Sequence, residues 1–173
     1  MMLSELNKGF TLIELLVVVA IIGVLAAVGV VAFNGFINNA KINTVKANHS
    51  SVVDYIQSEL WKCNLGSETE AYEKQQANPS VYSGYGSPKC DRQFRNIAAG
   101  IMSYLHNFDE KGYDNPFGDT LDTGINMQRS CPEIVNIGRI NIELMANNNE
   151  ITICSRWGSG ESDIIQSYIK NPF

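Results

Sequence analysis

The residue whose type and position point most clearly to a chemical role is Glu14, a carboxylate near the start of a long apolar run. Between residues 10 and 33, every side chain except those of Thr11 and Glu14 is apolar or absent. An ionisable group in a hydrophobic span costs about 2.5–3.5 kcal/mol near the bilayer centre on insertion scales, and less near an interface. Such a group normally has a partner, although this early position also allows Glu14 to reach back to the lipid headgroups.

The four cysteines, Cys63, Cys90, Cys131 and Cys154, all lie after this run. They form no C-x-x-C pair, and the sequence contains only two histidines, so we expect neither a zinc site nor a bound cofactor. Widely spaced cysteines beyond a membrane segment favour two disulfides and therefore an oxidising compartment. Four free thiols in a reducing compartment are the alternative.

The remaining polar residues give no support for catalysis, because no phosphate-binding glycine loop, nucleophile elbow or local triad is present. The segment 109–124 contains Asp114, Asp119 and Asp122, whose oxygens could bind calcium, but their spacing does not match an EF-hand. A solvated acidic turn is the favoured interpretation. The net charge of −5 argues against a nucleic-acid-binding face.

The apolar run is long enough to cross a membrane. A helix over residues 10–33 would measure about 36 Å, against about 30 Å for the hydrocarbon layer. A cleaved signal peptide has a shorter apolar region and no internal carboxylate, although the small residues near Ala26 and Ala27 keep that alternative open. The flanking charges do not fix the orientation, because they cancel before the run and lysines follow it.

The helix is predicted to continue past Phe33 to residue 63. A stripe with three-and-four spacing consists of Ile42, Val45, His49, Val52, Ile56, Leu60 and Cys63. His49 is expected to be a packed or rim residue rather than a ligand. Asn64–Gly66 is expected to stop the helix, because glycine suits the position after a helix end.

The rest of the chain predicts a small α+β head. Residues 64–90 are predicted to be a turn-rich connection, and 91–108 a second helix with Asp91 at its start. Residues 139–154 predict a β-hairpin, preceded by a strand at 133–137. With these strands we expect an antiparallel sheet packed on the long helix. The tail, residues 161–173, fits either a strand or a short helix.

The start of the apolar run resembles a known family. Lys8-Gly9-Phe10-Thr11-Leu12-Ile13-Glu14, followed by LLVVVAIIGVLAAV, resembles the N-terminus of type IV prepilins and of their relatives, the pseudopilins of secretion systems. The resemblance covers about residues 8–28, and beyond them only the layout is similar. It implies the pilin fold, in which a long N-terminal α-helix packs on a small antiparallel sheet.

The resemblance implies a leader, Met1–Gly9, that a prepilin peptidase removes before Phe10 is N-methylated. It implies a precursor that crosses the inner membrane once, with a cytoplasmic N-terminus and an outer head, and later enters an extracellular filament, the pilus. The implied partners are other copies of the chain, the peptidase and the pilus assembly machinery, without nucleic acid. The implied divisions are 1–9, 10–33 (filament core), 34–63 (amphipathic half) and 64–173 (head).

The same resemblance gives Glu14 a partner. Cleavage would leave an amine on Phe10, and the Glu14 carboxylate of a neighbouring subunit would neutralise it, which sets the axial stagger. Many family members carry a proline where this chain has Val30-Val31. Gly23 and Gly29 are therefore expected to be helix weak points in a filament, unless they only allow close helix packing.

A structural, non-enzymatic filament subunit is the leading hypothesis. A pseudopilin of a type II secretion system, or a minor or competence pilin, is the runner-up. Some pseudopilins bind calcium in a comparable acidic loop, so a calcium site at Asp114–Asp122, or low abundance, would favour this alternative. A monomeric membrane-anchored binding or enzymatic domain is the remote alternative. Three disulfide connectivities are possible, and the pilin layout favours Cys63–Cys90 with Cys131–Cys154. The sequence does not choose among adhesion, motility, DNA uptake and secretion.

Overall fold

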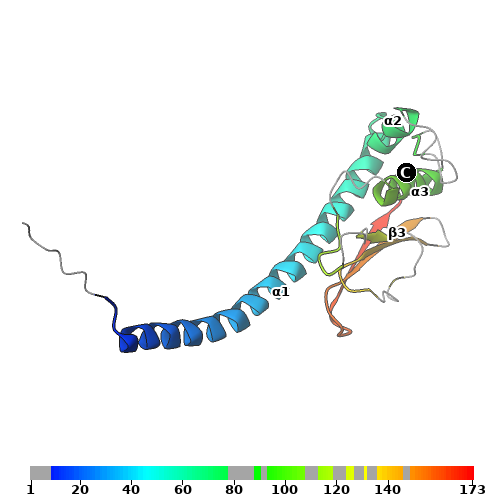
Figure 1. Cartoon of the computed structure of the whole chain (residues 1–173). Coiled ribbons are helices and arrows are strands. Elements are labelled where there is room, and N and C mark those ends of the chain that lie inside the picture. The colour runs from blue at the N-terminus through cyan, green and yellow to red at the C-terminus, as the bar shows by residue number, and fades with distance from the viewer. Residues whose placement is uncertain are drawn as a thin grey trace, which may run out of the picture. The chain divides into compact units, whose positions relative to one another are not determined.

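The first element of the fold is one long helix. The computed structural model describes residues 9–77, 88–90, 93–107, 113–118, 124–126, 131, 136–145 and 149–173. Helix α1 runs from Leu12 to Asn64 (Figure 1). The chain divides within this helix into two compact units, residues 1–40 and 41–173.

In the first unit, α1 presents apolar side chains on all sides. Phe10 is 88% exposed, and Val31 is 74% exposed. The helix contains an 18-residue window of mean hydropathy 3.1, none of it buried, so it is long and apolar enough to cross a membrane. It is helical through Gly23 and Gly29, so the expected weakness of those positions stays a prediction for the packed filament.

Within the described residues, the second unit contains a four-stranded sheet whose strands lie side by side in chain order. The predicted hairpin is confirmed as β2 (Ile140–Leu144) antiparallel to β3 (Glu150–Arg156). The tail forms β4 (Ile164–Lys170), antiparallel to β3. A two-residue strand, β1 (Ile125–Asn126), pairs with β2 in parallel, so the sheet is not wholly antiparallel.

Two expectations for the head need correction. The strand expected at 133–137 is not seen in its described part, because Asn136 and Ile137 lie in a bend and a turn, and 133–135 lie outside the described residues. The connection expected at 64–90 contains a helix, α2 (Glu70–Ala77). This helix escaped prediction because it is short and polar, and Ala71 is its only buried residue.

The predicted second helix is present as α3 (Phe94–Asn107), whereas the proposed capping residue, Asp91, lies outside the described residues. α3 contributes to one core with α1 and the sheet. The core side chains of α1 lie on the predicted stripe. They are at most 1% exposed: Val52, Ile56 and Leu60. One sheet face supplies the isoleucines Ile140, Ile142, Ile151, Ile153 and Ile169.

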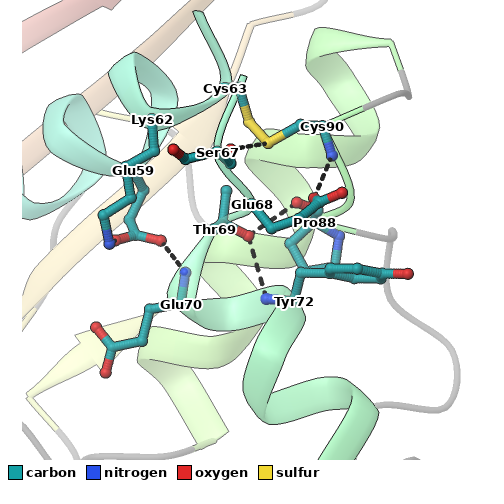
Figure 2. Close-up of a disulfide and its surroundings, with 10 residues drawn as sticks. All are labelled: Glu59, Lys62, Cys63, Ser67, Glu68, Thr69, Glu70, Tyr72, Pro88 and Cys90. Atoms are coloured by element: carbon teal, nitrogen blue, oxygen red, sulfur yellow. Dashed lines mark hydrogen bonds and ion pairs between the residues drawn. A yellow bond between two sulfur atoms is a disulfide. The ribbon is translucent and has the colours of Figure 1, made fainter. Parts of the chain in front are cut away.

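Two disulfides hold the head together: Cys63–Cys90 and Cys131–Cys154. Of the three possible connectivities, this is the one that the pilin layout favours. Cys63–Cys90 lies at the end of α1, beside the start of α2 (Figure 2). In the chain-entropy model, loops of this length contribute about 3–4 kcal/mol each to stability.

The start of α2 is fixed by buried polar contacts around that disulfide. Thr69 is the N-cap: its Oγ1 accepts the Tyr72 N–H at 3.1 Å and donates to the Pro88 carbonyl at 2.8 Å. Glu59 of α1 accepts the Glu70 N–H through Oε2 at 2.6 Å and pairs with Lys62 (Figure 2). These contacts satisfy backbone donors that a helix start leaves free.

Candidate functional site

The most distinctive local geometry is at the start of α1, where three hydrogen bonds join Thr11 and Glu14. Thr11 immediately precedes the helix, and its Oγ1 accepts the Glu14 N–H at 3.3 Å. Glu14 Oε2 accepts both the Thr11 backbone N–H and the Thr11 hydroxyl, each at 2.8 Å. This reciprocal arrangement is a capping box. The Thr-x-x-Glu spacing was a signal for it that reasoning from the sequence overlooked.

The capping box uses only part of the carboxylate of Glu14. Only Oε2 accepts the hydrogen bonds from Thr11. Glu14 also forms no ion pair within the described residues, where the ion pair found is Glu59–Lys62. An anion near the first turn of a helix also interacts favourably with the positive end of the helix dipole. Glu14 is therefore an exposed carboxylate with capacity left for an external cation.

The peptide bond between Gly9 and Phe10 is accessible. Both residues are exposed and lie before the first helical residue. A Cβ added at Gly9 would meet nothing within 4 Å, so the glycine is not required by packing within this chain. An exposed, non-helical peptide bond can enter the cleft of a protease, whereas a helical one must first unwind.

The apolar half of α1 offers a surface for other helices. Ala20, Ile21, Val24 and Leu25 line a shallow depression of about 310 Å³. An apolar depression on a helix surface can receive a side chain from a facing helix. Burying a large apolar side chain contributes about 1.5–3 kcal/mol, so the many exposed side chains from Phe10 to Phe36 provide a strong drive toward lipid or protein.

The calcium expectation receives no support from the described residues. Asp114 is exposed, whereas Asp119 and Asp122 lie outside the described part of the chain. Within that part, no group of three His, Cys, Asp or Glu side chains could hold a metal ion. The neighbouring Asn115 is buried, and its Oδ1 accepts the Phe117 N–H at 2.9 Å, as in a local turn.

His49 packs between the long helix and the sheet, as the stripe predicts. Its Nδ1 lies 2.8 Å from Ser155 Oγ of β3, and its Nε2 lies 2.9 Å from Ser167 Oγ of β4. Serine hydroxyls both donate and accept, so they satisfy either neutral tautomer. Burial lowers the pKa of His49 below its ordinary value. The residue therefore links α1 to two strands and offers no open ligand position.

A partly buried polar network near the end of α1 was not foreseen from the sequence. The Tyr55 and Tyr104 hydroxyls donate to the two Glu70 carboxylate oxygens at 3.4 and 3.3 Å. Burial, together with the charges of Glu59 and Glu70, raises the pKa of Tyr55, so it remains a donor. Glu59 follows Val52 by seven residues and Ile56 by three. Its place on the buried stripe was the available signal.

Comparison with known proteins identifies the N-terminal segment. Residues 6–30 match the model of the prokaryotic N-terminal methylation motif. The type IV major fimbrial protein FimA of Dichelobacter nodosus is 51% identical over 41 residues, 24% of this chain and 26% of that protein. Another FimA from the same species is 46% identical over 70 residues, 37% of this chain and 45% of that protein.

A further relative is the fimbrial protein EcpC of Eikenella corrodens, which is 45% identical over 42 residues, 24% of this chain and 28% of that protein. The chain thus spans about a quarter to just under half of the length of the curated relatives described here. No solved structure matches the chain. The family-model match, residues 6–30, includes the capping box and most of the apolar run.

Proposed function

We propose that this chain, a member of the type IV pilin family by its N-terminal segment, is a structural subunit of a type IV pilus-like filament. The observation that supports this most directly is the pairing of the methylation motif at residues 6–30 with a helix that is apolar on all sides. The relatives that share this segment are named as fimbrial proteins. No catalytic role is part of the proposal.

Processing would begin at the accessible peptide bond between Gly9 and Phe10. Removal of the leader, Met1–Gly9, by a prepilin peptidase creates an amine on Phe10, which is then N-methylated. The amine remains cationic after methylation. It lies at the edge of the apolar helix, where an unpaired charge is costly, so it favours a neighbouring anion.

Glu14 would supply that anion in the filament. Its carboxylate is exposed, and only Oε2 is used by Thr11. A subunit whose Glu14 meets the Phe10 amine of its neighbour pairs both charges in an apolar surrounding, where attraction is stronger than in water. A wrong axial stagger leaves both charges unpaired. The pair therefore selects the register in which the helices pack.

The apolar surface of α1 would drive the assembly. In the precursor, lipid of the inner membrane covers this surface, with the N-terminus in the cytoplasm and the cysteine-containing head in the oxidising compartment outside. In the filament, neighbouring copies cover it, and the pilus assembly machinery moves each subunit from one environment to the other. Gly23 and Gly29 are the positions at which we expect the packed helix to adjust.

The proposal is tested by intact mass measurement of filaments sheared from cells. We expect an abundant chain that begins at methylated Phe10 and gains the mass of four hydrogen atoms on reduction of two disulfides. An untrimmed chain would refute the processing step. A trimmed chain confined to the membrane would favour a pseudopilin or a minor pilin.

A further inference from the structure

The outer edge of β4 carries backbone groups that no strand of the described residues pairs. β4 is the last strand of the order β1-β2-β3-β4. The Asn171 N–H donates to the Asn149 carbonyl at 2.9 Å, so this opposing pair is hydrogen-bonded toward β3. In an antiparallel ladder, bonded and non-bonded pairs alternate. Lys170 and Tyr168 therefore direct their N–H and C=O groups away from β3.

A second bond supports this assignment independently. The Glu150 carbonyl accepts the Met145 N–H at 3.0 Å, so Glu150 directs its backbone groups toward β2 and not toward β4. Glu150 is the residue opposite Lys170 in the register of β3 and β4. Two hydrogen bonds, one on each strand, therefore indicate that the backbone groups of Lys170 point away from β3: Asn171 to Asn149 and Met145 to Glu150. An open edge of this kind is a template for another strand.

A groove lies along that open edge. It has a volume of about 320 Å³ and is lined by Gln57, Leu60 and Trp61 of α1 and by five consecutive residues, Tyr168–Pro172. Successive side chains of a strand point to opposite faces. Because Tyr168–Pro172 are consecutive, the side of the groove that they form is the edge of the strand and not one of its faces. Space beside that edge is where an added strand would lie.

The groove has the features of a preformed binding site. Leu60 and Ile169 are buried, whereas Trp61 and Tyr168 remain 58% and 55% exposed. The far end is fixed because Asn64 Nδ2 donates to the Pro172 carbonyl at 3.3 Å. Exposed aromatic side chains beside buried aliphatic ones are typical anchors of binding surfaces.

From these observations we propose that the groove binds an extended segment of a partner protein, which adds as a strand beside Tyr168 and Lys170. The segment carries an apolar side chain that packs against Trp61, and an acidic residue that faces Lys170. The charge follows from the lining, in which Lys170 is the single ionisable cation and no acid is present. Main-chain bonds would provide affinity, and the two side chains specificity.

The test uses the full-length chain, labelled with ¹⁵N, in detergent micelles. The probe is a blocked pentapeptide with phenylalanine at its centre and glutamate at one end. We expect saturable shifts of the Tyr168 and Lys170 amide signals and at least about tenfold slower hydrogen exchange at both. Trp61→Ala should weaken binding about tenfold. Leu65→Ala, which removes an exposed side chain at the end of α1 outside the groove, should not.

Two changes separate strand addition from simple apolar binding. Tyr168→Pro removes an outward N–H without removing a bond to β3, and should weaken binding far more than Tyr168→Ala, which loses the same ring but keeps the N–H. N-methylation of the peptide, which leaves the protein unchanged, should weaken binding at least tenfold. A glutamate-to-lysine peptide should bind more weakly, by a factor that shrinks with salt.

Three results would overturn the proposal. The first is binding of the N-methylated peptide as strong as that of the parent peptide. The second is a set of shifts at Trp61 without protection of the Tyr168 and Lys170 amides. The third is edge protection that appears with rising protein concentration alone, which would mean that a second copy occupies the edge. None of these outcomes depends on leader removal or filament formation, so the proposed function is tested separately.

Discussion

Replacing Glu59 tests whether a buried carboxylate of α1 holds the start of α2 in place. Glu59 is 1% exposed, accepts the Glu70 N–H at 2.6 Å, and pairs with Lys62. Alanine removes both interactions and leaves the Glu70 N–H without its acceptor, which costs about 1.5–3 kcal/mol for a bond to a charged group. Lost side-chain burial adds about 0.8 kcal/mol per methylene. We expect Glu59→Ala to lower the free energy of unfolding by about 3 kcal/mol.

Glu59→Gln distinguishes the effect of losing the hydrogen-bond acceptor from the effect of losing the negative charge. The amide oxygen can still accept the Glu70 N–H, and the ion pair is lost. The Lys62 side chain is 41% exposed, so solvent screens this pair and its contribution is about 0–1 kcal/mol. A neutral acceptor also binds more weakly than a charged one, while the cost of burying a charge disappears. We therefore expect a loss of about 1 kcal/mol, well below that of the alanine variant.

The assay is urea unfolding of the full-length chain in a non-ionic detergent, followed by tryptophan fluorescence. Glu68→Gln is the matched control, because Glu68 accepts the Cys90 N–H at an exposed position and should change stability by less than about 0.5 kcal/mol. Equal losses in the glutamine and alanine variants would refute the role of Glu59 as an acceptor. A loss below about 0.5 kcal/mol in Glu59→Ala would refute any role in fixing α2.

Three further predictions follow from the two units of the chain. Glu14→Gln keeps an oxygen for the Thr11 bonds but removes the charge, so it should reduce sheared filaments as severely as Glu14→Ala while leaving membrane insertion and leader removal intact; a normal filament yield would contradict the charge pair. Gly9→Val should stop the proposed leader removal, because it places a branched side chain directly before the proposed cut, and a normally trimmed chain by mass would contradict that assignment. The pKa of His49 is lowered in the folded state, so the unfolded state binds a proton first as pH falls. The free energy of unfolding should therefore be constant above about pH 6.5 and decrease below it. His49→Gln should reduce this pH dependence, whereas an unchanged slope would exclude His49 as its source.

The sequence predicted those parts of the fold that rest on regular patterns. The three-and-four stripe placed Val52 and Ile56 in the core, and alternation predicted the hairpin of β2 and β3. It did not predict α2, because a short helix whose start is held by Thr69 and Glu59 carries little periodic signal. β1 was missed for a related reason: two residues that pair in parallel with β2 have no alternation to read.

The candidate site could be predicted only in part, because the type of a residue shows whether its side chain is charged but not which other residues it contacts. Glu14 was identified from the cost of an acid in an apolar run, but its bonds to Thr11 follow from the exact start of the helix at Leu12. The groove beside β4 could not be predicted, because Trp61 and Tyr168 are far apart in the sequence. Their proximity depends on the packing of the last turns of α1 against the strand edge.

The observed capping role of Glu14 is compatible with its proposed role in the charge pair, and the combination would explain why threonine precedes the helix. In the uncleaved chain, Oε2 holds the Thr11 N–H and hydroxyl, so the first turn of α1 is formed before any partner arrives. Cleavage before Phe10 leaves the Thr11 N–H in place, because that amide belongs to the bond between Phe10 and Thr11. A neighbouring amine can then bind the carboxylate without displacing the cap. Helix order is thus retained before assembly, and pairing need not carry the entropy of forming a first turn. On this argument Thr11→Val should slow filament formation less than Glu14→Gln, since it loses the cap and keeps the charge; the reverse order in sheared yield would mean that helix capping, and not charge, limits assembly.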